Sequence, residues 1–552
     1  MRIDIIDNTK ALAGVRANWE AVYDADPEAQ YFLSWEWLSK WLPAIKVPWF
    51  VLAARPDADG SAYAAFLPLW LETKAEKSGG CHNRIQMGGN YAADYTGLLC
   101  LPGQEEQAIT AFADRIKQLN WTDFRLDDLR MSDRRIALLT QGFSKAEFDV
   151  AKRDRSEDGI DLSICPVASL PDDWEAYLES RLSANARQKI RRLLRQVETS
   201  DQFRITQAEK DTLGRDLDIL LKFWTQRWGP QKGQRLDGIL KNSRLMLRHA
   251  FDAGSLFLPV LWQGERPVGA LATLVDARKR SFHFYMAGRD ETFDGPQPGL
   301  VLHAHSIRHA IRGGFVAYDF LRGNEPYKYS FGVEERRNSS FAITTRDKKN
   351  LSGRLDRRSL PFALQTAMEH HRAGRRAEAE RGYRQILDID PRNADALYGL
   401  GQILQKRSEH AAAIELFQTL LAAAPETHKA WFRLGRSLRA RGELAEAVGA
   451  YCEGIERQPA IAGAYSDLGQ ILLDLGQPDQ AVAAFDAARS LRADFPGIEA
   501  KLTRALDIGA KPSARRAALR ADLRERVGRL SAIATAAARD KAVASSRTDR
   551  LA

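Results

Sequence analysis

The sequence predicts a mixed α/β region followed by an all-α solenoid of short repeats. Two observations support this fold class. Ser281–Gly332 has the pattern of strand, loop, helix and strand. Between 360 and 495, an alanine and an aromatic residue each recur every 34 positions. A chain of 552 residues is long enough for two to four domains, each with its own core.

The composition is that of a soluble globular protein, with 44% hydrophobic and 28% charged residues. No apolar run reaches the ~18 residues of a membrane-spanning helix, and the N-terminus is too charged for a secretory signal. The cysteines are scattered, which argues for a reducing compartment and against a CxxC metal site; they are Cys81, Cys100, Cys165 and Cys452. We therefore expect a cytoplasmic protein without a transmembrane segment or a metal, and interpret the cysteines as core residues.

Residues 1–155 are predicted to form a first α/β half. Phe50–Ala54 and Ala64–Trp70 have the pattern of strands on either side of a Pro/Gly break. Leu12–Ala25 and Glu106–Leu119 have apolar residues at helical spacing.

Residues 160–350 are predicted to form a second α/β half after a charged linker. Its helices are expected at Leu170–Leu182, Ser183–Val197, Asp211–Trp228 and Ser243–Ala253. Its strands are expected to form a meander of Leu256–Leu261, Val268–Val275 and Ser281–Ala287.

The last strand of the meander is expected to begin a strand–helix–strand unit that contains a Gly/Pro-rich loop. Leu300 opens a helix after a Gly/Pro-rich loop, and two glycines end it before a short strand, Phe315–Leu321. A strand, a crossover helix and a strand indicate parallel pairing.

The loop before that helix is a candidate phosphate site. A helix N-terminus offers unpaired N–H groups to an anion, and glycine lets a phosphate approach the backbone. We predict that Gly288, Gly295, Gly299 and Leu300 bind the pyrophosphate of a nucleotide-tailed cofactor. The loop is neither a GxGxxG nor a P-loop motif, and an ordinary strand–helix turn is the alternative.

The C-terminal part repeats with a period of 34 residues. Alanine and an aromatic residue keep this spacing over four copies, at Ala379, Ala413, Ala447 and Ala481 and at Tyr383, Phe417, Tyr451 and Phe485. This period is typical of tetratricopeptide (TPR) repeats, which stack into a solenoid with a groove for a protein partner. We frame the four repeats over 360–495, with a degenerate first copy.

Residues 496–552 are predicted to form a basic helical tail. Lys511–Ala552 holds eleven Lys or Arg against four Asp or Glu, which gives +7 of the net charge of +9. We interpret the tail as a capping or solvated helical end, with contact to an acidic partner, nucleic acid or lipid as the alternative.

Several short motifs of the α/β region together resemble one protein family. They include Pro298-Gly299-Leu300, Asp319-Phe320, Arg322-Gly323 and Tyr327-Lys328. The segment that holds them resembles the end of GNAT-superfamily acetyltransferases of the CelD/BcsL type, a group linked with cellulose biosynthesis. The likeness covers roughly residues 30–345, and two halves in tandem resemble the FemAB-like arrangement. The usual GNAT phosphate signature, [QR]xxGx[GA], is absent.

The resemblance implies transfer of an acyl group from acetyl-CoA or another acyl-CoA. The acceptor would be a hydroxyl or amine of a saccharide, exopolysaccharide or envelope precursor, and N- and O-acylation both stay open. Asp319 would act as the base, with Tyr327 and Lys328 beside it. Substrate-binding residues would be Arg322, Glu325, Asp94, Tyr95, Trp224, Trp228 and His283. The alternative is a structural pair of Asp319 with Arg322 and a core position for Tyr327.

Two other classes of function stay open. A FemAB-like aminoacyltransferase would use aminoacyl-tRNA, with the basic face of Arg187–Arg195 as the RNA contact; nucleic acid is expected only in this case. A non-catalytic TPR scaffold is the third class. In the favoured reading, the TPR module recruits the enzyme to an inner-membrane synthesis complex.

Overall fold

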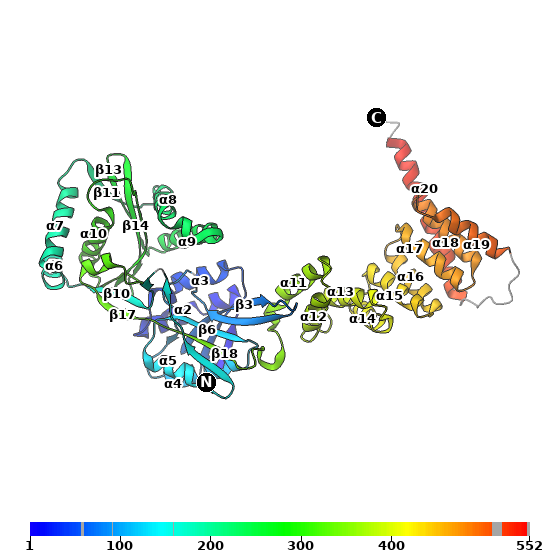
Figure 1. Ribbon diagram of the computed structural model, residues 1–552, viewed down its shortest axis with the longest axis horizontal. Coiled ribbons are helices and arrows are strands. Elements are labelled where there is room, and N and C mark those ends of the chain that lie inside the picture. The colour runs from blue at the N-terminus through cyan, green and yellow to red at the C-terminus, as the bar shows by residue number, and fades with distance from the viewer. Residues whose placement is uncertain (57–59, 91, 158, 511–520, 549–552) are drawn as a thin grey trace. The chain divides into compact units, whose positions relative to one another are not determined.

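The computed structural model describes residues 1–56, 60–90, 92–157, 159–510 and 521–548, with the backbone alone for 539–548 (Figure 1). The chain divides into two compact units. The first comprises Met1–Lys74 and His82–Arg358, and the second groups Ala75–Cys81 with the chain from Ser359 onward. The first unit is α/β and the second is almost entirely helical, as the sequence predicts.

The first half of the α/β unit is built on a mixed sheet of order β1-β2-β3-β4-β6-β18-β7, with β5 paired to β3. Its strands are β1 (Arg2–Ile6), β2 (Trp49–Arg55), β3 (Ala65–Ala75), β4 (Cys81–Met87), β5 (Leu99–Cys100), β6 (Asp123–Leu129), β7 (Phe148–Lys152) and β18 (Ser339–Thr345). Its helices are α1 (Thr9–Gly14), α2 (Arg16–Ala25), α3 (Trp35–Ala44), α4 (Glu105–Lys117) and α5 (Asp133–Gln141). The two strands expected around the Pro/Gly break lie in β2 and β3, which pair antiparallel.

Strand β18 departs from the expected division of the chain. It lies in the range 160–350 that we assigned to the second half, but it pairs antiparallel with β6 and β7 in the first sheet. Phe341 and Ile343 lie two positions apart on one face of β18, and both pack on the core of the first half. This packing explains why β18 pairs with the first sheet. The chain therefore returns to the first half before it enters the helical unit.

The second half is built on a sheet of order β11-β13-β14-β15-β16-β10-β17, with β12 paired to β14. Its strands are β10 (Ile164–Ser169), β11 (Phe203–Gln207), β12 (Leu256–Phe257), β13 (Pro259–Gln263), β14 (Arg266–Asp276), β15 (Ser281–Arg289), β16 (Ala317–Asp319) and β17 (Glu334–Arg337). Its helices are α6 (Trp174–Arg181), α7 (Ala184–Glu198), α8 (Leu213–Lys232), α9 (Leu236–Asp252) and α10 (Pro298–Arg312). The predicted meander is confirmed, and β15 and β16 pair in parallel on either side of α10, as expected.

The two halves share one hydrophobic core. Its buried members include Trp37 and Tyr95 of the first half and Leu217 and Leu247 of the second. Buried hydrogen bonds also join the halves: Tyr23 donates to Asp276 (2.5 Å), Tyr95 donates to Asp319 (2.7 Å), and the hydroxyls of Tyr31 and Ser255 are 2.8 Å apart. Because the linked groups are buried, separating the halves would expose apolar surface and break these bonds.

The second unit stacks pairs of antiparallel helices, as the 34-residue period predicts. The repeat helices are α11 (Leu360–Arg372), α12 (Arg376–Leu387), α13 (Ala394–Lys406), α14 (His410–Ala423), α15 (His428–Ala440), α16 (Leu444–Arg457), α17 (Ala462–Asp474) and α18 (Pro478–Leu491). A Cβ at Gly401, Gly435 or Gly469 would lie 2.5–2.7 Å from the aromatic ring at Phe417, Tyr451 or Phe485. The recurring glycine is therefore required by the recurring aromatic ring.

The described part of the basic tail packs on the solenoid. After α19 (Ile498–Gly509), helix α20 (Ala521–Thr548) lies against α16 and α18 and buries Val527, Leu530 and Ala534. Arg526 pairs with Glu453 (2.6 Å) and Glu456 (2.5 Å). The start of α20 is thus a packed cap rather than a solvated end, and the rest of the predicted tail, 511–520 and 549–552, lies outside the described residues. Every helix that the structure describes is too short or too polar to span a bilayer.

The close approach of Gly435 to the Tyr451 ring predicts how a larger residue at Gly435 would change the stability of the solenoid. Gly435→Ala should destabilise the solenoid by about 1–3 kcal/mol, because the new methyl group overlaps the Tyr451 ring. Gly449→Ala is the matched control in α16, where a Cβ has no neighbour within 4 Å, and should stabilise by about 0.5–1 kcal/mol through helix propensity. Urea denaturation of the full chain measures both changes, and shifts of the same sign would contradict the packing argument.

Candidate functional site

Eight of the fourteen predicted site residues line two cavities on opposite faces of β15. The first, the α10 cavity, has a volume of about 560 Å³ and is lined by Phe284 and the start of α10. The second, the inter-half cavity, has a volume of about 550 Å³ and is lined by His283 and Asp319. Because adjacent side chains of a strand point to opposite faces, Phe284 and His283 face different cavities.

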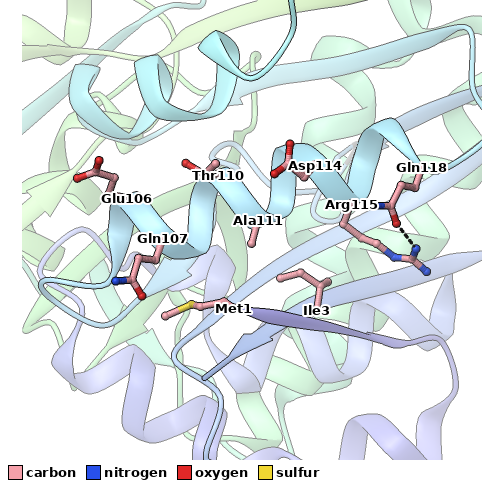
Figure 2. Close-up of a pocket in the computed structure, with 9 residues that line it drawn as sticks. All are labelled: Met1, Ile3, Glu106, Gln107, Thr110, Ala111, Asp114, Arg115 and Gln118. Carbon is pink, nitrogen blue, oxygen red and sulfur yellow. Dashed lines mark hydrogen bonds between the residues drawn. The ribbon is translucent and has the colours of Figure 1, made fainter. Parts of the chain in front are cut away.

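A third hollow of about 620 Å³ lies between α4 and β1 (Figure 2). Met1 and Ile3 form its apolar floor, and polar side chains of α4 form its rim (Figure 2). Arg115 donates to Gln118 (2.7 Å), and Asp114 pairs with Lys117 (2.8 Å). None of the predicted site residues lines this hollow.

The α10 cavity is built around an open helix N-terminus. Pro298 is the first residue of α10, and the preceding Gln297 makes no side-chain cap. By helix geometry the amides of Gly299 and Leu300 then have no partner within the helix. A Cβ at Gly269 of β14 would lie 2.7 Å from the Pro298 ring, so glycine there lets the start of α10 lie directly on the sheet.

The cavity lies where β15 and β16 diverge. The strands pair only from Ser281 to His283, and β15 then continues to Arg289 while the chain beyond β16 enters the 3₁₀ helix η3 (Pro326–Phe331). A register shift in β14–β15 leaves Tyr285 without a partner in the ladder. The bulged residue Tyr285 lies between Phe284 and Ala287, which both line the cavity.

The α10 cavity carries more positive than negative charge. Lys189, Arg227 and Arg289 line it with one acid, Glu291, which pairs with Arg289 (3.0 Å). The apolar wall comes from Trp228, Phe284 and Leu300. A cleft with cations beside an apolar wall fits a ligand that has phosphate groups and a long uncharged arm.

The predicted cofactor residues have different roles. Leu300 and Gly299 line the cavity, and a Cβ at Gly299 would have no neighbour within 4 Å. Gly288 also lines it, but a Cβ there would lie 2.5 Å from Phe223 and 2.7 Å from the backbone nitrogen of Trp224, so this glycine allows α8 to approach β15. Gly295 does not line the cavity.

Tyr327 lines the α10 cavity next to a histidine that the sequence analysis missed. The ring of Tyr327 lies 5.6 Å from the ring of His303, whose Nδ1 is 3.0 Å from the Tyr318 hydroxyl. Burial, then the nearby charge of Lys328, lowers the pKa of His303 to about 3, so this imidazole is neutral. His303 follows Leu300 by three positions, and this helical spacing was the available signal.

The Tyr327 hydroxyl stays protonated at neutral pH. Although 38% of the residue is exposed, burial and then the charge of Glu325 raise the pKa of Tyr327 well above its ordinary value. The side chain can therefore act as a hydrogen-bond donor.

The three predicted catalytic residues do not form one group. Asp319 faces the inter-half cavity, where it accepts hydrogen bonds from the Tyr95 hydroxyl (2.7 Å) and the Leu321 amide (2.8 Å). Lys328 is buried, donates to the carbonyls of Arg322 (2.7 Å) and Gly323 (3.0 Å), and pairs with Glu325. Only Tyr327 reaches the α10 cavity, since η3 turns Lys328 inward and Asp319 lies on the other face of its strand.

Arg322 is a structural residue that joins the two halves. Its guanidinium binds Asp94 (2.8 Å) and Asp128 (2.5 Å), both from the first half. Burial lowers the pKa of Arg322, but the charges of these two carboxylates outweigh burial and raise the pKa above its ordinary value. Arg322 and Asp94 therefore form an ion pair with each other and do not present free charges to a substrate.

The inter-half cavity brings together three predicted residues, Tyr95, His283 and Asp319. His283 Nε2 lies 2.9 Å from the Ser281 hydroxyl, and His283 Nδ1 lies 3.8 Å from an Asp319 carboxylate oxygen.

The two predicted tryptophans lie in different places: Trp228 lines the α10 cavity, whereas Trp224 packs on the shared core.

Comparison with known families agrees with this geometry. Residues 184–329 match the family model of the acetyltransferase (GNAT) domain. Residues 364–425, 402–460 and 462–495 match models of the tetratricopeptide repeat. The chain thus carries a GNAT-type acetyltransferase domain followed by TPR repeats, and the matched residues include all those that line the α10 cavity except Ser330. No curated protein matches the chain.

Similar solved structures each cover a part of the chain. FemX is 10% identical and covers 62% of this chain and 97% of its own, with a TM-score of 0.43. A conserved protein of unknown function from Bacteroides thetaiotaomicron is 12% identical and covers 62% and 100%, with a TM-score of 0.38. The MamA protein is 21% identical and covers 33% and 94%, with a TM-score of 0.27. We draw no conclusion about function from likenesses at this level.

The partly buried ion pairs of Arg322 predict a clear loss of stability on substitution. Arg322→Ala removes the ion-pair partner of Asp94 and leaves Asp128 with Arg155 alone, so it should lower the free energy of unfolding by about 2–3 kcal/mol, less than the ~3–5 kcal/mol of a fully buried pair. Arg289→Ala removes an exposed ion pair and should cost less than about 1 kcal/mol. Equal losses for the two variants in urea denaturation would contradict the structural role of Arg322.

Proposed function

We propose that the protein transfers an acyl group, in the simplest case acetyl, from acyl-CoA bound in the α10 cavity to a hydroxyl or amine. The observation that carries this proposal is the cleft between the diverging strands β15 and β16, with the open N-terminus of α10 at its edge. The GNAT match over the same residues supports an acyl-CoA donor.

The charges of the cleft fit the donor. The free amides of Gly299 and Leu300 and the positive end of the α10 dipole suit the pyrophosphate. Lys189 and Arg227 add cationic side chains to the lining of the cavity. The apolar side chain of Phe284 and the indole of Trp228 suit the uncharged arm that ends in the thioester.

The reaction needs donors for the charge that develops at the thioester. The acceptor nitrogen or oxygen attacks the thioester carbonyl carbon, the C–S bond breaks with its electron pair going to sulfur, and the proton that the acceptor loses ends on the leaving CoA thiol. The backbone amide of Tyr285, at the bulge of β15, is a candidate donor to the carbonyl oxygen, and the Tyr327 hydroxyl is a candidate donor to the leaving sulfur. The neutral imidazole of His303 lies beside Tyr327 and can help to hold its ring.

The acceptor and the partner are proposed from the resemblance of the sequence. A saccharide, exopolysaccharide or envelope precursor would supply the hydroxyl or amine. The TPR repeats would bind a protein and thereby bring the enzyme to a synthesis complex at the inner membrane, which raises the local concentration of acceptor.

The donor site makes a direct prediction about CoA affinity. Gly299→Val should lower the affinity for acetyl-CoA by roughly tenfold or more, because the new side chain occupies the space into which the first turn of α10 opens. The fold should tolerate the change, since a Cβ at Gly299 meets no atom within 4 Å. Isothermal titration calorimetry measures the affinity.

A matched control separates this effect from helix propensity. Gly238 lies in the first turn of α9, has the same open surroundings and lines neither cavity. Gly238→Val should leave the affinity unchanged. Wild-type affinity in a folded Gly299→Val protein would exclude the proposed donor site.

The role of Tyr327 predicts a selective loss of turnover. Tyr327→Phe removes one donor to developing negative charge and should lower kcat by roughly 10²-fold, with little change in KM for acetyl-CoA. Tyr329→Phe is the control on the same 3₁₀ helix, where the hydroxyl donates to Glu335 (2.6 Å), and should retain full turnover. Steady-state kinetics that show equal rates for Tyr327→Phe and the wild type would remove Tyr327 from the mechanism.

A FemAB-like aminoacyltransferase remains the second candidate, favoured by the basic residues of α7, of which Lys189 reaches the α10 cavity. Gentle purification followed by mass spectrometry distinguishes the two. Copurified acyl-CoA supports the acyltransferase, and copurified tRNA supports the alternative.

A further inference from the structure

The inter-half cavity is a second site that the proposed acyl transfer does not use. The first half contributes Tyr95, Arg130 and Met131 to its wall, and the second half contributes Ser281, His283 and Asp319. Its volume of about 550 Å³ is that of a small-molecule site. It opens on the face of β15 opposite the α10 cavity, so a ligand here would not compete with acyl-CoA.

Two guanidinium groups at this cavity have no carboxylate partner among the residues that the structure describes. Arg130 lies over the Tyr95 ring at 5.6 Å, and Arg336 stands at the exposed rim. Other arginines nearby are neutralised, since Arg153 and Arg155 pair with Asp127 and Asp128.

The other charged groups of the cavity are already engaged. Lys279 donates to the backbone carbonyls of Asp24 and Asp26, and Glu28 accepts from the amide of Ser132. Asp319 accepts two hydrogen bonds, from Tyr95 and from the backbone. The charge of Arg130 therefore remains available inside the cavity.

His283 provides an independent indication of a ligand. The residue is 4% exposed, and its Nδ1 has no hydrogen-bond partner among the described residues. The nearest carboxylate oxygen, on Asp319, is 3.8 Å away. Burial lowers the pKa of His283; the charges of Asp319 and Asp276 oppose this shift, and the charge of Arg130 adds a smaller lowering. A buried polar atom without a partner costs free energy that a bound group can recover.

We propose that the inter-half cavity binds a small organic anion whose carboxylate or phosphate group lies on Arg130. A guanidinium binds such groups through two parallel hydrogen bonds, which a lysine cannot do. Ser281 and His283 supply further hydrogen-bonding groups at the inner end, and Arg336 lies at the entrance. Because the wall comes from both halves, the ligand would bridge them.

Methionine methyl NMR tests this proposal, because Met131 lines the cavity and the chain has only six methionines. The full-length protein is labelled with ¹³C-methyl methionine, and Met131 is assigned with Met131→Leu. Inorganic phosphate and succinate are titrated separately as probes of the two anion types. The expected result is a saturable shift of the Met131 resonance with at least one probe, and the responding probe identifies the anion type. The absence of a shift with both probes would overturn the proposal.

Charge-removing variants locate the effect. Arg130→Gln should lower the affinity for the anion that shifts Met131 by roughly tenfold or more. Arg289→Gln, in the α10 cavity, should leave the Met131 titration curve unchanged. Unchanged positions of the other five methionine resonances show that Arg130→Gln is folded. If it is not folded, Arg336→Gln serves instead, with a smaller loss expected. Wild-type affinity in the folded arginine variant would contradict the proposal.

Discussion

The ion pairs of Arg322 with Asp94 and Asp128 are the constraint on which the rest of the α/β unit depends. They join the segment after β16 to the first half across a buried boundary. The backbone on both sides is unusual, since Leu321 and Asp128 have φ angles of +57° and +58°. Such conformations persist only where surrounding contacts impose them. Here the Asp319 carboxylate accepts from the Leu321 amide, and Arg322 binds Asp128 itself.

This anchored segment determines what each face of the second sheet can do. Asp319 and His283 point toward the first half, whereas Tyr318 and Phe284 pack on the side of α10. The chain then turns through η3 and presents Tyr327 to the α10 cavity. Two cavities of similar volume therefore form back to back on one sheet. One has an open helix end, and the other has two guanidinium groups without a carboxylate partner among the described residues.

The sequence predicted the architecture better than it predicted which site residues lie together in one cavity. Periodicity alone identified the meander, the parallel pair around α10 and the solenoid, because each depends on local alternation or on a 34-residue repeat. The crossing of β18 into the first sheet depends on contacts more than 180 residues apart, which no local pattern contains. The same limit applies to the site. The packing of the two halves brings Asp319 next to Tyr95. His303 is buried within the second half by the rings of Phe284, Phe320 and Phe331, which lie outside α10 in separate segments of the chain.

Hydrogen exchange of the full-length protein with and without acetyl-CoA tests the central claim, that the donor binds between the open end of α10 and the diverging part of β15. The account predicts slower exchange on ligand binding in peptides that cover Phe284–Gly288 and Gly299–His303, with no change in β18 or in the TPR helices. Protection confined to peptides of the inter-half cavity, such as those that cover Arg130 and Met131, would contradict it.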